Sequence, residues 1–254
     1  MAKIYIINRQ CAFSAVSVNK ARPPWFSREK CLKSILNEIA GHANVDYRCV
    51  YDNARGPVSN HFVSKMVAPE RIHQLTEGTE AGAFLRTLDY IASLTPDDND
   101  IICVLEDDHL MRPNWLTALV EGIELLDDVD KFRNNGFCCL LDYGDKYTKM
   151  YSGLWSEIFA TKSCHWRITP STVQSFACRY KTLKQSDEVH RYYSTGTDIS
   201  RDHEKFVTLG KIGLPLISPI PSFSAHIAVG LLPPVIDWEW VNEKLTHEAG
   251  DTKL

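Results

Sequence analysis

Three consecutive carboxylates, Glu106, Asp107 and Asp108, follow a run of apolar residues over 101–105. The run is short, rich in β-branched residues and preceded by a breaker-rich stretch, so it predicts a strand that is buried on both faces. Open α/β sheets form their ligand crevices at the carboxyl ends of such strands. Adjacent negative charges are costly there unless a cation or hydrogen-bond donors compensate them, and a divalent metal ion is the simplest such cation.

The spacing of the acids indicates which of them could share one ion. If the strand stays extended, Glu106 and Asp108 point to one side and Asp107 to the other. Oxygen ligands suit Mg2+ or Mn2+, which proteins commonly hold through one or two carboxylates together with substrate phosphates. The other interpretation is an acidic turn that caps the helix expected from Pro113, and the residues alone leave both open.

Composition bounds the class of protein. Of the 254 residues 44% are hydrophobic and 24% are charged, as in an ordinary soluble globular protein, and this length suffices for one α/β domain. A net charge of -4 gives no electrostatic reason to expect nucleic acid or an anionic membrane as a partner. An anionic ligand would therefore need a local site made of a metal ion, helix N-termini or single basic residues.

The cysteines and the apolar runs predict the compartment. The eight cysteines lie mostly inside apolar runs and form no Cys-x-x-Cys pair, which argues against a zinc site or a disulfide framework and for reduced, buried thiols. The chain enters its first strand directly, and no apolar stretch approaches the ~20 residues that span a bilayer. We therefore expect a cytoplasmic protein without a signal peptide or an integral membrane segment.

Strand and helix patterns alternate around the acids. Apolar periodicity predicts strands over 3–7, 47–51, 101–105, 137–141 and 214–220, and helices over 27–40, 79–94, 170–180 and 199–209, with further helices from Pro113 and around Trp238 to Val241. Polar loops are expected over 127–135 and up to Tyr193. The opening β-α-β order predicts a right-handed crossover and parallel strands.

Aromatic residues are spaced along the stretch from Tyr143 to Trp166, interleaved with Gly, Lys and Ser rather than with aliphatic residues. Such a segment can form a sugar-stacking or lid surface, and half-exposed strands produce the same pattern. The pattern leaves both interpretations open. Trp155 and Trp166 are the candidates for stacking on an acceptor.

The order of these segments resembles the GT-A glycosyltransferases, particularly the large inverting group that includes family 2. The resemblance begins with the helical segment from Gly78 to Arg86, followed by the acids as an Asp-x-Asp-like motif and by Met111-Arg112-Pro113-Asn114-Trp115-Leu116. It continues by order of elements with Asp198, Gly210 and a Pro-x-x-x-x-His segment from Pro221 to His226. The first acid is Glu instead of Asp, and the usual acidic pair before the late helix is reduced to Thr197-Asp198.

This resemblance implies an α/β fold of the GT-A type, with a mostly parallel central sheet flanked by helices and a C-terminal acceptor-binding portion. It divides a single domain over 1–254 into a nucleotide-sugar-binding half (1–135), an acceptor-binding half (136–232) and a C-terminal tail (233–254). The implied activity is metal-dependent transfer of a sugar from a nucleotide-diphosphate donor, a UDP-sugar, to a carbohydrate or other hydroxyl acceptor, with inversion. A retaining glycosyltransferase and a metal-dependent sugar nucleotidyltransferase are the alternatives.

The resemblance also assigns roles to single residues. Asp108 would be the first ligand of Mn2+ or Mg2+, joined by Glu106 and His226. The donor would contact Asn8, Arg9, Asp52, Arg86, Glu106 and Asp107. Asp198, at the start of a late helix, would be the general base that takes the proton of the acceptor hydroxyl. Ordinary structural explanations stand beside these roles: a helix cap for Asp198, a turn for Asp52, a core position for His226 and a solvated face for Arg86.

Other classes of protein fit parts of the pattern. A nucleotidyltransferase would also use an acidic metal motif, but it usually has a Gly-rich, basic phosphate loop just after its first strand, and residues 8–13 contain no glycine. A carbohydrate-binding module would explain the aromatic residues and not the acids after a buried strand. A glycosidase needs two carboxylates across a sugar, which Asp108 and Asp198 could supply.

Overall fold

The computed structural model describes residues 2–14, 17–170 and 172–247. Its α-helices are α1 (Arg28–Ile39), α2 (Val63–Met66), α3 (Glu80–Ser93), α4 (Trp115–Asp128), α5 (Tyr180–Tyr192), α6 (Asp202–Lys211) and α7 (Trp238–His247). Its strands are β1 (Ile4–Cys11), β2 (Val45–Asp52), β3 (Ile72–Leu75), β4 (Ile101–Leu105), β5 (His109–Met111), β6 (Phe137–Cys138), β7 (Ile158–Ala160), β8 (His165–Thr169), β9 (Phe176–Arg179), β10 (Leu216–Ile220) and β11 (Ser224–His226). Short 3-10 helices are η1 (Asn53–Arg55), η2 (Val58–Asn60), η3 (Pro69–Arg71), η4 (Asp130–Phe132), η5 (Gly144–Tyr147) and η6 (Lys149–Tyr151).

A nine-stranded sheet in the order β3-β2-β1-β4-β9-β6-β10-β8-β7 forms the centre of the molecule. Strands β3, β2, β1 and β4 are parallel, as the opening β-α-β order predicts. Strand β9 is antiparallel to both of its neighbours, and β8 is antiparallel to β10 and β7. All strands of this sheet other than β8 and β9 therefore run the same way in the described chain. The predicted α/β fold with a mostly parallel sheet is confirmed.

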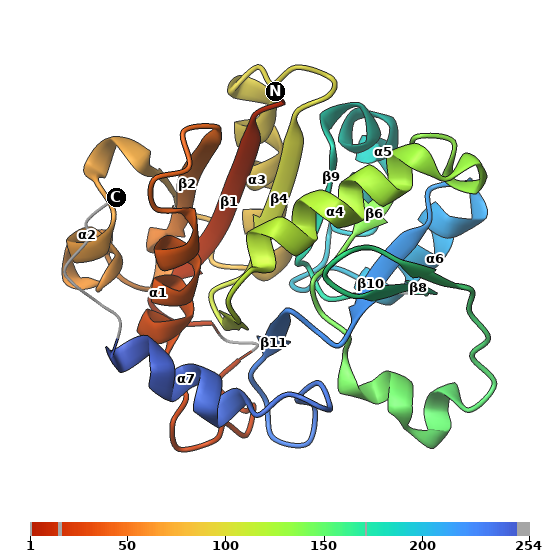
Figure 1. Cartoon of the computed structure of the whole chain (residues 1–254). Coiled ribbons are helices and arrows are strands. Elements are labelled where there is room, and N and C mark those ends of the chain that lie inside the picture. Colours follow the sequence, from red (N-terminus) through yellow and green to blue (C-terminus); the bar gives the residue numbers. More distant parts are fainter. Residues whose placement is uncertain (1, 15–16, 171, 248–254) are drawn as a thin grey trace.

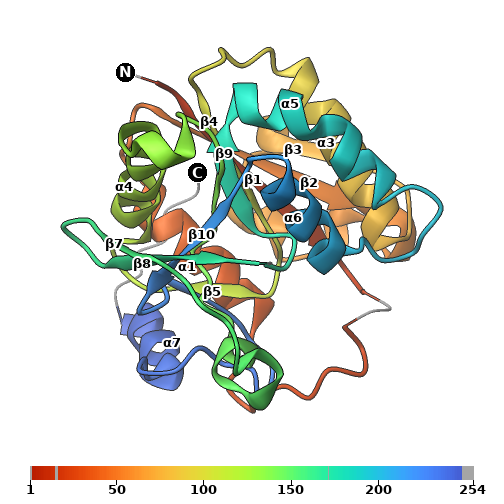
Figure 2. The same ribbon diagram turned by 90° about the vertical axis from the view of Figure 1, so that its right-hand side faces the viewer.

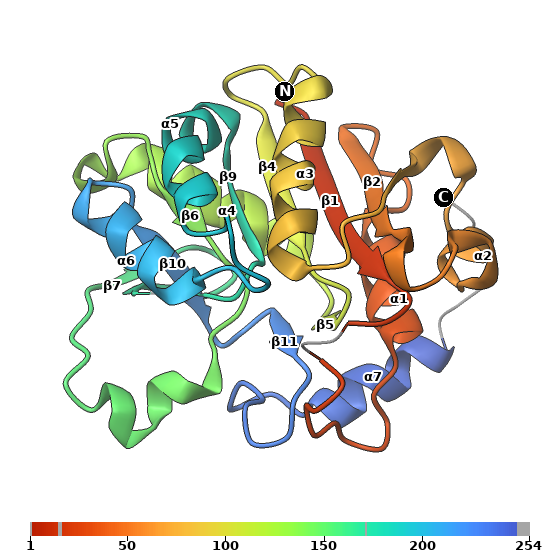
Figure 3. The same ribbon diagram turned by 180° about the vertical axis from the view of Figure 1, so that it is seen from behind.

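Helices cover both faces of this sheet. Helices α1 and α4 lie on the face seen in Figure 1, and α3, α5 and α6 lie on the face seen in Figure 3. Strand β1 supplies both cores, because Ile4 and Ile6 belong to one buried cluster and Tyr5 and Ile7 to the other. Alternate residues of a strand point to opposite faces, so a strand covered on both faces needs a continuous apolar run.

A second sheet of two strands, β5 and β11, lies beside the carboxyl end of β4. Helix α7 covers it (Figures 1 and 2), through a buried cluster that includes Leu110, Ala225, Trp238 and Val241. The last helix expected from the sequence is therefore present, and it begins at Trp238. Residues 248–254 of the expected tail lie outside the described residues.

The prediction of a helix over 170–180 is wrong. Residues 176–179 form β9, which inserts between β4 and β6, and α5 occupies the stretch expected to be a polar loop. The inner face of α5 includes Thr182, Ser186 and His190, so its buried stripe is only partly apolar and the segment as a whole is polar. Strand β9 is short and wholly apolar up to Arg179, a pattern that a buried helix segment shares.

Two further expectations, about the cysteines and about membrane-spanning helices, can be compared with the structure. All eight cysteines are free, and seven of them are buried. Within the described ranges, no helix combines the length and the apolar character needed to cross a membrane.

Candidate active site

A pocket of about 340 Å3 lies where β1, β2 and β4 end, and the segments that precede α3 and α6 close it. Carboxyl ends of parallel strands that share one edge form such crevices. Acidic side chains from both halves of the chain line it: Asp52, Glu80, Glu106, Asp107, Asp108, Asp198 and Asp202. Arg9 and His226, also expected at the site, line the same pocket.

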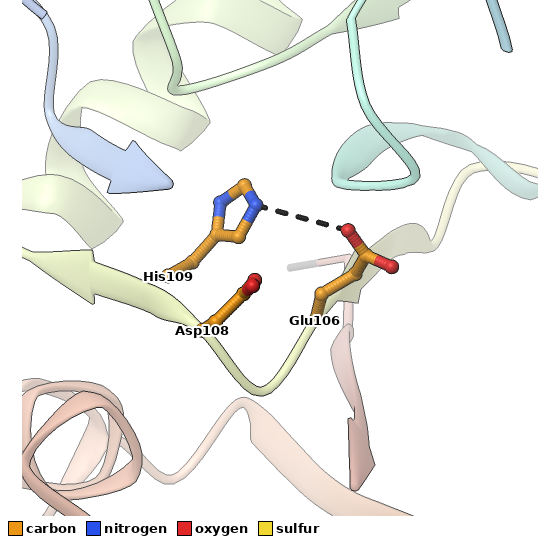
Figure 4. A group of neighbouring side chains, drawn as sticks. All are labelled: Glu106, Asp108 and His109. Carbon is orange, nitrogen blue, oxygen red and sulfur yellow. Dashed lines mark ion pairs between the residues drawn. The ribbon is translucent and has the colours of Figure 1, made fainter. Parts of the chain in front are cut away.

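The chain turns after β4 and pairs again as β5, so the acids form a short turn between two strands. Glu106 and Asp108 offer carboxylate oxygens, and His109 offers a ring nitrogen, all within 4.8 Å of one another. Figure 4 shows these three side chains around a common space, with the ion pair between His109 and Glu106 marked. Asp107 instead lies near Cys11 and Arg28.

Strand β11 brings His226 to this turn. Its residues pair antiparallel with β5, and His226 lies opposite His109. Nε2 of His226 is 3.1 Å from Oδ2 of Asp108, and both side chains are buried. His226 therefore contacts Asp108, while the donor atoms that lie within 4.8 Å of one another belong to Glu106, Asp108 and His109.

Each of the three acids has a basic partner from β1, from the β1–α1 connection or from the first residue of α1. The closest approaches are 3.8 Å for Arg9 and Glu106, 3.4 Å for Arg28 and Asp107, and 2.6 Å for Arg22 and Asp108. Like charges that share a site need such compensation. The chain's own cations therefore supply much of the compensation that the sequence pattern requires.

These surroundings separate the pKa values of the acids. Burial raises the pKa of Glu106 well above its usual range, and it raises the pKa of Asp107 to about 6 against the charge of Arg28. Burial would also raise the pKa of Asp108, but the hydrogen bond and charge of His226, with His109 and Lys20, hold it well below its usual range. Asp108 is thus the acid of the three that stays ionised to the lowest pH.

The donor set fits a divalent cation. It combines carboxylate oxygens with imidazole nitrogen, ligands that suit Mn2+. Burial lowers the pKa of His109 to about 3, so its ring is neutral at pH 7, the form in which imidazole binds metal. Nδ1 of His109 and Nδ1 of His226 have no hydrogen-bond partner within the described part of the chain. Glu106 and Asp108, with one or both imidazoles, are the residues that could hold the ion.

A second charged cluster forms the opposite wall of the pocket. Oδ1 of Asp202 accepts a hydrogen bond from Nζ of Lys205 at 3.1 Å, and Lys205 also donates to Gln174 at 3.0 Å. Glu80 accepts from Arg9 at 2.9 Å and from the amide of Ser200 at 2.7 Å. Burial, together with the charge of Glu80, raises the pKa of Asp202 to about 6 against the attraction of Lys205. Asp202 can therefore exchange a proton near neutral pH.

The late helix begins at a different residue from the one expected from the sequence. Helix α6 begins at Asp202 and not at Ile199. The amide of Ala81 donates to the carbonyl of Asp198 at 3.2 Å, and Ser200 donates to Glu80, so the start of α3 holds residues 198–200 outside the helix. Asp198 lines the pocket as an exposed residue before the helix, and the acid at the helix start is Asp202.

Asp52 lies on the pocket wall with its carboxylate bound to the backbone. It accepts hydrogen bonds from the amides of Ala54 at 2.9 Å, Glu77 at 3.2 Å and Gly78 at 2.8 Å. Gly78 has a φ of +76°, a left-handed conformation that favours glycine. Asp52 therefore stabilises a turn, as its ordinary structural explanation predicts. A contact with a donor would be a second role of the same side chain.

Two of the residues expected to contact the nucleotide-sugar donor, Asn8 and Arg86, do not line the pocket. Asn8 is fully buried, and its amide donates to the carbonyls of Leu105 and Glu106 and accepts from Tyr47, so it joins the ends of β1 and β4. The side chain of Arg86 is 60% exposed on α3 and pairs with Glu77 and Asp89. Neither residue lines the pocket, because the first faces the interior and the second faces solvent.

The two tryptophans expected to bind the acceptor are also outside the pocket. Trp166, on β8, is fully buried and donates to Oγ1 of Thr161. It packs against Gly122 so tightly that a Cβ there would lie 2.7 Å from the indole ring. Trp155 is 80% exposed. The prediction for Trp166 is wrong because the indole completes the core, and the strand that carries it, β8, is mostly buried.

Several residues at the site were not found from the sequence. Lys20 and Arg22 form a basic pair in the connection after β1. They lie beyond residues 8–13, the stretch just after the first strand where a phosphate loop usually lies. His109 directly follows the acids, and only its pairing opposite His226 reveals its position. The sequence does not indicate that Glu80 and Lys205 belong to the site, because only their contacts with other charged side chains in the folded chain show it.

Comparisons with known proteins assign no family to this chain. Neither a family model nor a curated protein matches this chain. Similar solved structures include 4-diphosphocytidyl-2C-methyl-D-erythritol synthase, with 13% identity and a TM-score of 0.46 over 97% of this chain and 99% of that one. A second is 2-C-methyl-D-erythritol 4-phosphate cytidylyltransferase of Francisella tularensis, with 8% identity and a TM-score of 0.47 over 96% of this chain and 98% of that one.

A third is a nucleoside-diphosphate-sugar pyrophosphorylase from Vibrio cholerae, with 14% identity and a TM-score of 0.45 over 85% of this chain and 91% of that one. No family model matches this chain, so membership of glycosyltransferase family 2 remains a resemblance of sequence order. Likenesses this distant carry no argument about the reaction.

Proposed function

We propose that this chain is a transferase that acts on a nucleotide-activated sugar, and that glycosyl transfer to a hydroxyl acceptor is its first candidate reaction. One observation carries the proposal: a single pocket holds an acid turn whose donor atoms could hold a cation on one wall and Asp202, an acid that can exchange a proton near neutral pH, on another. Glycosyl transfer from a nucleoside diphosphate needs both functions, charge neutralisation for the leaving diphosphate and a base for the acceptor.

The ligands proposed for Mn2+ or Mg2+ are Asp108 and Glu106, with His226 or His109. When bound, the ion would act as a Lewis acid that neutralises the diphosphate. Arg9, which lines the pocket and is held by Glu80, adds positive charge beside Glu106.

Asp202 is the proposed general base, in place of Asp198. As the acceptor oxygen attacks the anomeric carbon, its proton passes to a carboxylate oxygen of Asp202 while the bond to the diphosphate breaks with its electron pair on the leaving group. The first turn of a helix favours a negative charge, and the ion pair with Lys205 fixes the carboxylate in place. Lys205 is a positioning residue in this arrangement, because its Nζ is buried behind Asp202 and contacts Gln174.

A second candidate is nucleotidyl transfer, in which a sugar phosphate attacks the α-phosphorus of a nucleoside triphosphate and releases pyrophosphate. A specific observation favours it. The connection after β1 brings Lys20, Arg22 and Arg28 to the acids, so basic residues do follow the first strand although no glycine-rich loop precedes them. The name of one similar solved structure, a cytidylyltransferase, refers to a reaction of this class.

One assay separates the two candidates. Purified protein is incubated with Mn2+ and either a panel of UDP-sugars with glycan acceptors or nucleoside triphosphates with sugar phosphates, and free UDP and pyrophosphate are measured. We expect metal-dependent, acceptor-dependent release of UDP. Release of pyrophosphate instead would establish the second candidate. Asp108→Asn should abolish product with either substrate set, while Asp128→Asn, an exposed acid on α4, should leave product formation unchanged. Full activity under excess chelator would contradict the metal assignment.

A further inference from the structure

The ammonium group of Lys20 lies beside two of the proposed metal ligands. Its Nζ is 3.0 Å from Nε2 of His226 and 3.8 Å from Oδ2 of Asp108, while those two atoms are 3.1 Å apart. Nε2 cannot accept from the ammonium and donate to the carboxylate at once, so one of its two contacts is always unfulfilled. The ammonium group thus contacts two of the proposed ligands and would compete with a divalent ion for them.

Arg22 binds the same carboxylate in a more permanent way. Its guanidinium is 2.6 Å from Oδ2 of Asp108, donates to the carbonyl of Ile227 and lies 4.5 Å from the ring centre of Phe26. Its side chain is 14% exposed, against 32% for Lys20. Lys20 carries its charge on a flexible four-carbon stem and also lines the pocket. Of the two cations, Lys20 is the one that can leave Asp108 without breaking other contacts of the fold.

We propose that Lys20 is an exchangeable counter-ion of this site: it holds Asp108 and His226 in the free protein, and it moves to the diphosphate when a divalent ion binds with a nucleotide. This inference rests on the proposed function. Metal alone must displace an ammonium group from both ligands and should bind weakly. A nucleoside diphosphate offers phosphate oxygens to the displaced ammonium, so metal and nucleotide should bind cooperatively, each raising the affinity for the other by the same factor.

Equilibrium binding tests this without turnover. Free Mn2+ is followed by its electron paramagnetic resonance signal, and UDP binding is measured by calorimetry, each with and without the other ligand. Lys20→Met should bind Mn2+ alone about tenfold more tightly, because the cation that competes for the proposed ligands is removed. It should bind UDP alone about tenfold more weakly and lose most of the cooperativity. Lys20→Arg should retain the cooperativity, and Lys65→Met, an exposed lysine on α2, is the matched control.

Two results would overturn the inference: Lys20→Met that binds Mn2+ alone no more tightly than the unaltered protein, or that keeps full cooperativity with UDP. Lys20 is a partly exposed side chain, and circular dichroism of each variant verifies the fold. If the unaltered protein binds no UDP in any condition, the proposed function fails and the diphosphate contact fails with it. The Mn2+ titration still reports in that case whether Lys20 occupies the place of the cation.

Discussion

At the scale of single residues, the site depends on carboxylates whose neighbours give them different proton affinities. Asp108 is ionised because His226 and the basic residues of the β1–α1 connection surround it, while Asp202 is poised near neutral pH by burial beside Lys205 and Glu80. Pairs of titratable groups with pKa values pushed apart are typical of sites that bind a cation with one acid and move a proton with another.

We expect Asp202→Asn to lower turnover about a hundredfold or more, because the amide cannot take a proton from the acceptor. Because the pKa of Asp202 is raised to about 6, its active, ionised form increases as the pH rises through that value, so turnover of the unaltered protein should rise from pH 5 to a plateau above about 7. Initial rates with saturating donor and acceptor across this range are the measurement.

The matched variants are Asp198→Asn and Glu204→Gln. Both side chains are exposed, one before α6 and one on its first turn, and both variants should keep near-normal turnover and the same pH profile. If Asp198→Asn loses activity and Asp202→Asn keeps it, the base is Asp198 as the sequence resemblance implies.

At the scale of elements, two acids join the segments that line the pocket. Glu80 holds residue 200 against α3, and Asp52 holds the loop before α3 against the end of β2. Both contacts help to shape the pocket, because the segments that they join contribute residues to its lining.

Asp52→Ala should reduce the free energy of unfolding by about 3 kcal/mol, because three backbone amides lose a charged acceptor and each such bond contributes roughly 1–3 kcal/mol. Asp52→Asn keeps one acceptor oxygen and should lose about half as much. Urea unfolding followed by circular dichroism measures both. Unchanged stability with a raised Michaelis constant for the donor would make Asp52 a substrate contact alone.

At the scale of the whole molecule, the pocket draws on both halves of the chain. Strands β1, β2 and β4 supply one wall, and α6 and β11 supply side chains from the other half. A ligand that fills the pocket therefore contacts both and should stabilise the folded chain as a unit.

UDP with Mn2+ at about a hundred times its dissociation constant should stabilise the native state by about 2.7 kcal/mol. For a chain of this size that corresponds to a rise in the melting temperature of roughly 5–10 °C. Differential scanning calorimetry with UDP alone, Mn2+ alone and both together is the measurement. No rise with any nucleoside diphosphate would speak against a nucleotide site.

Local pattern was enough to predict the fold class and one wall of the site. The buried run over 101–105 and the acids after it are contiguous, so the sequence alone predicts a buried strand that ends at a ligand crevice. The parallel arrangement of β1, β2 and β4 follows from the β-α-β connection. Asp202 and His226 also lie where the order of segments suggested an acid and a histidine, within one helical turn for the acid.

Only the tertiary structure decided which cations meet those acids and which side chains face away from the pocket. Lys20, Arg22 and Glu80 are distant in sequence from the charges they contact, and the pairing of β5 with β11 is what brings His109 to His226. Asn8 and Trp166 turned inward because hydrogen bonds and core packing, which arise between segments, set their direction. Electrostatic and packing energies act through space, so a pattern along the chain determines them only where the partners are also neighbours in sequence.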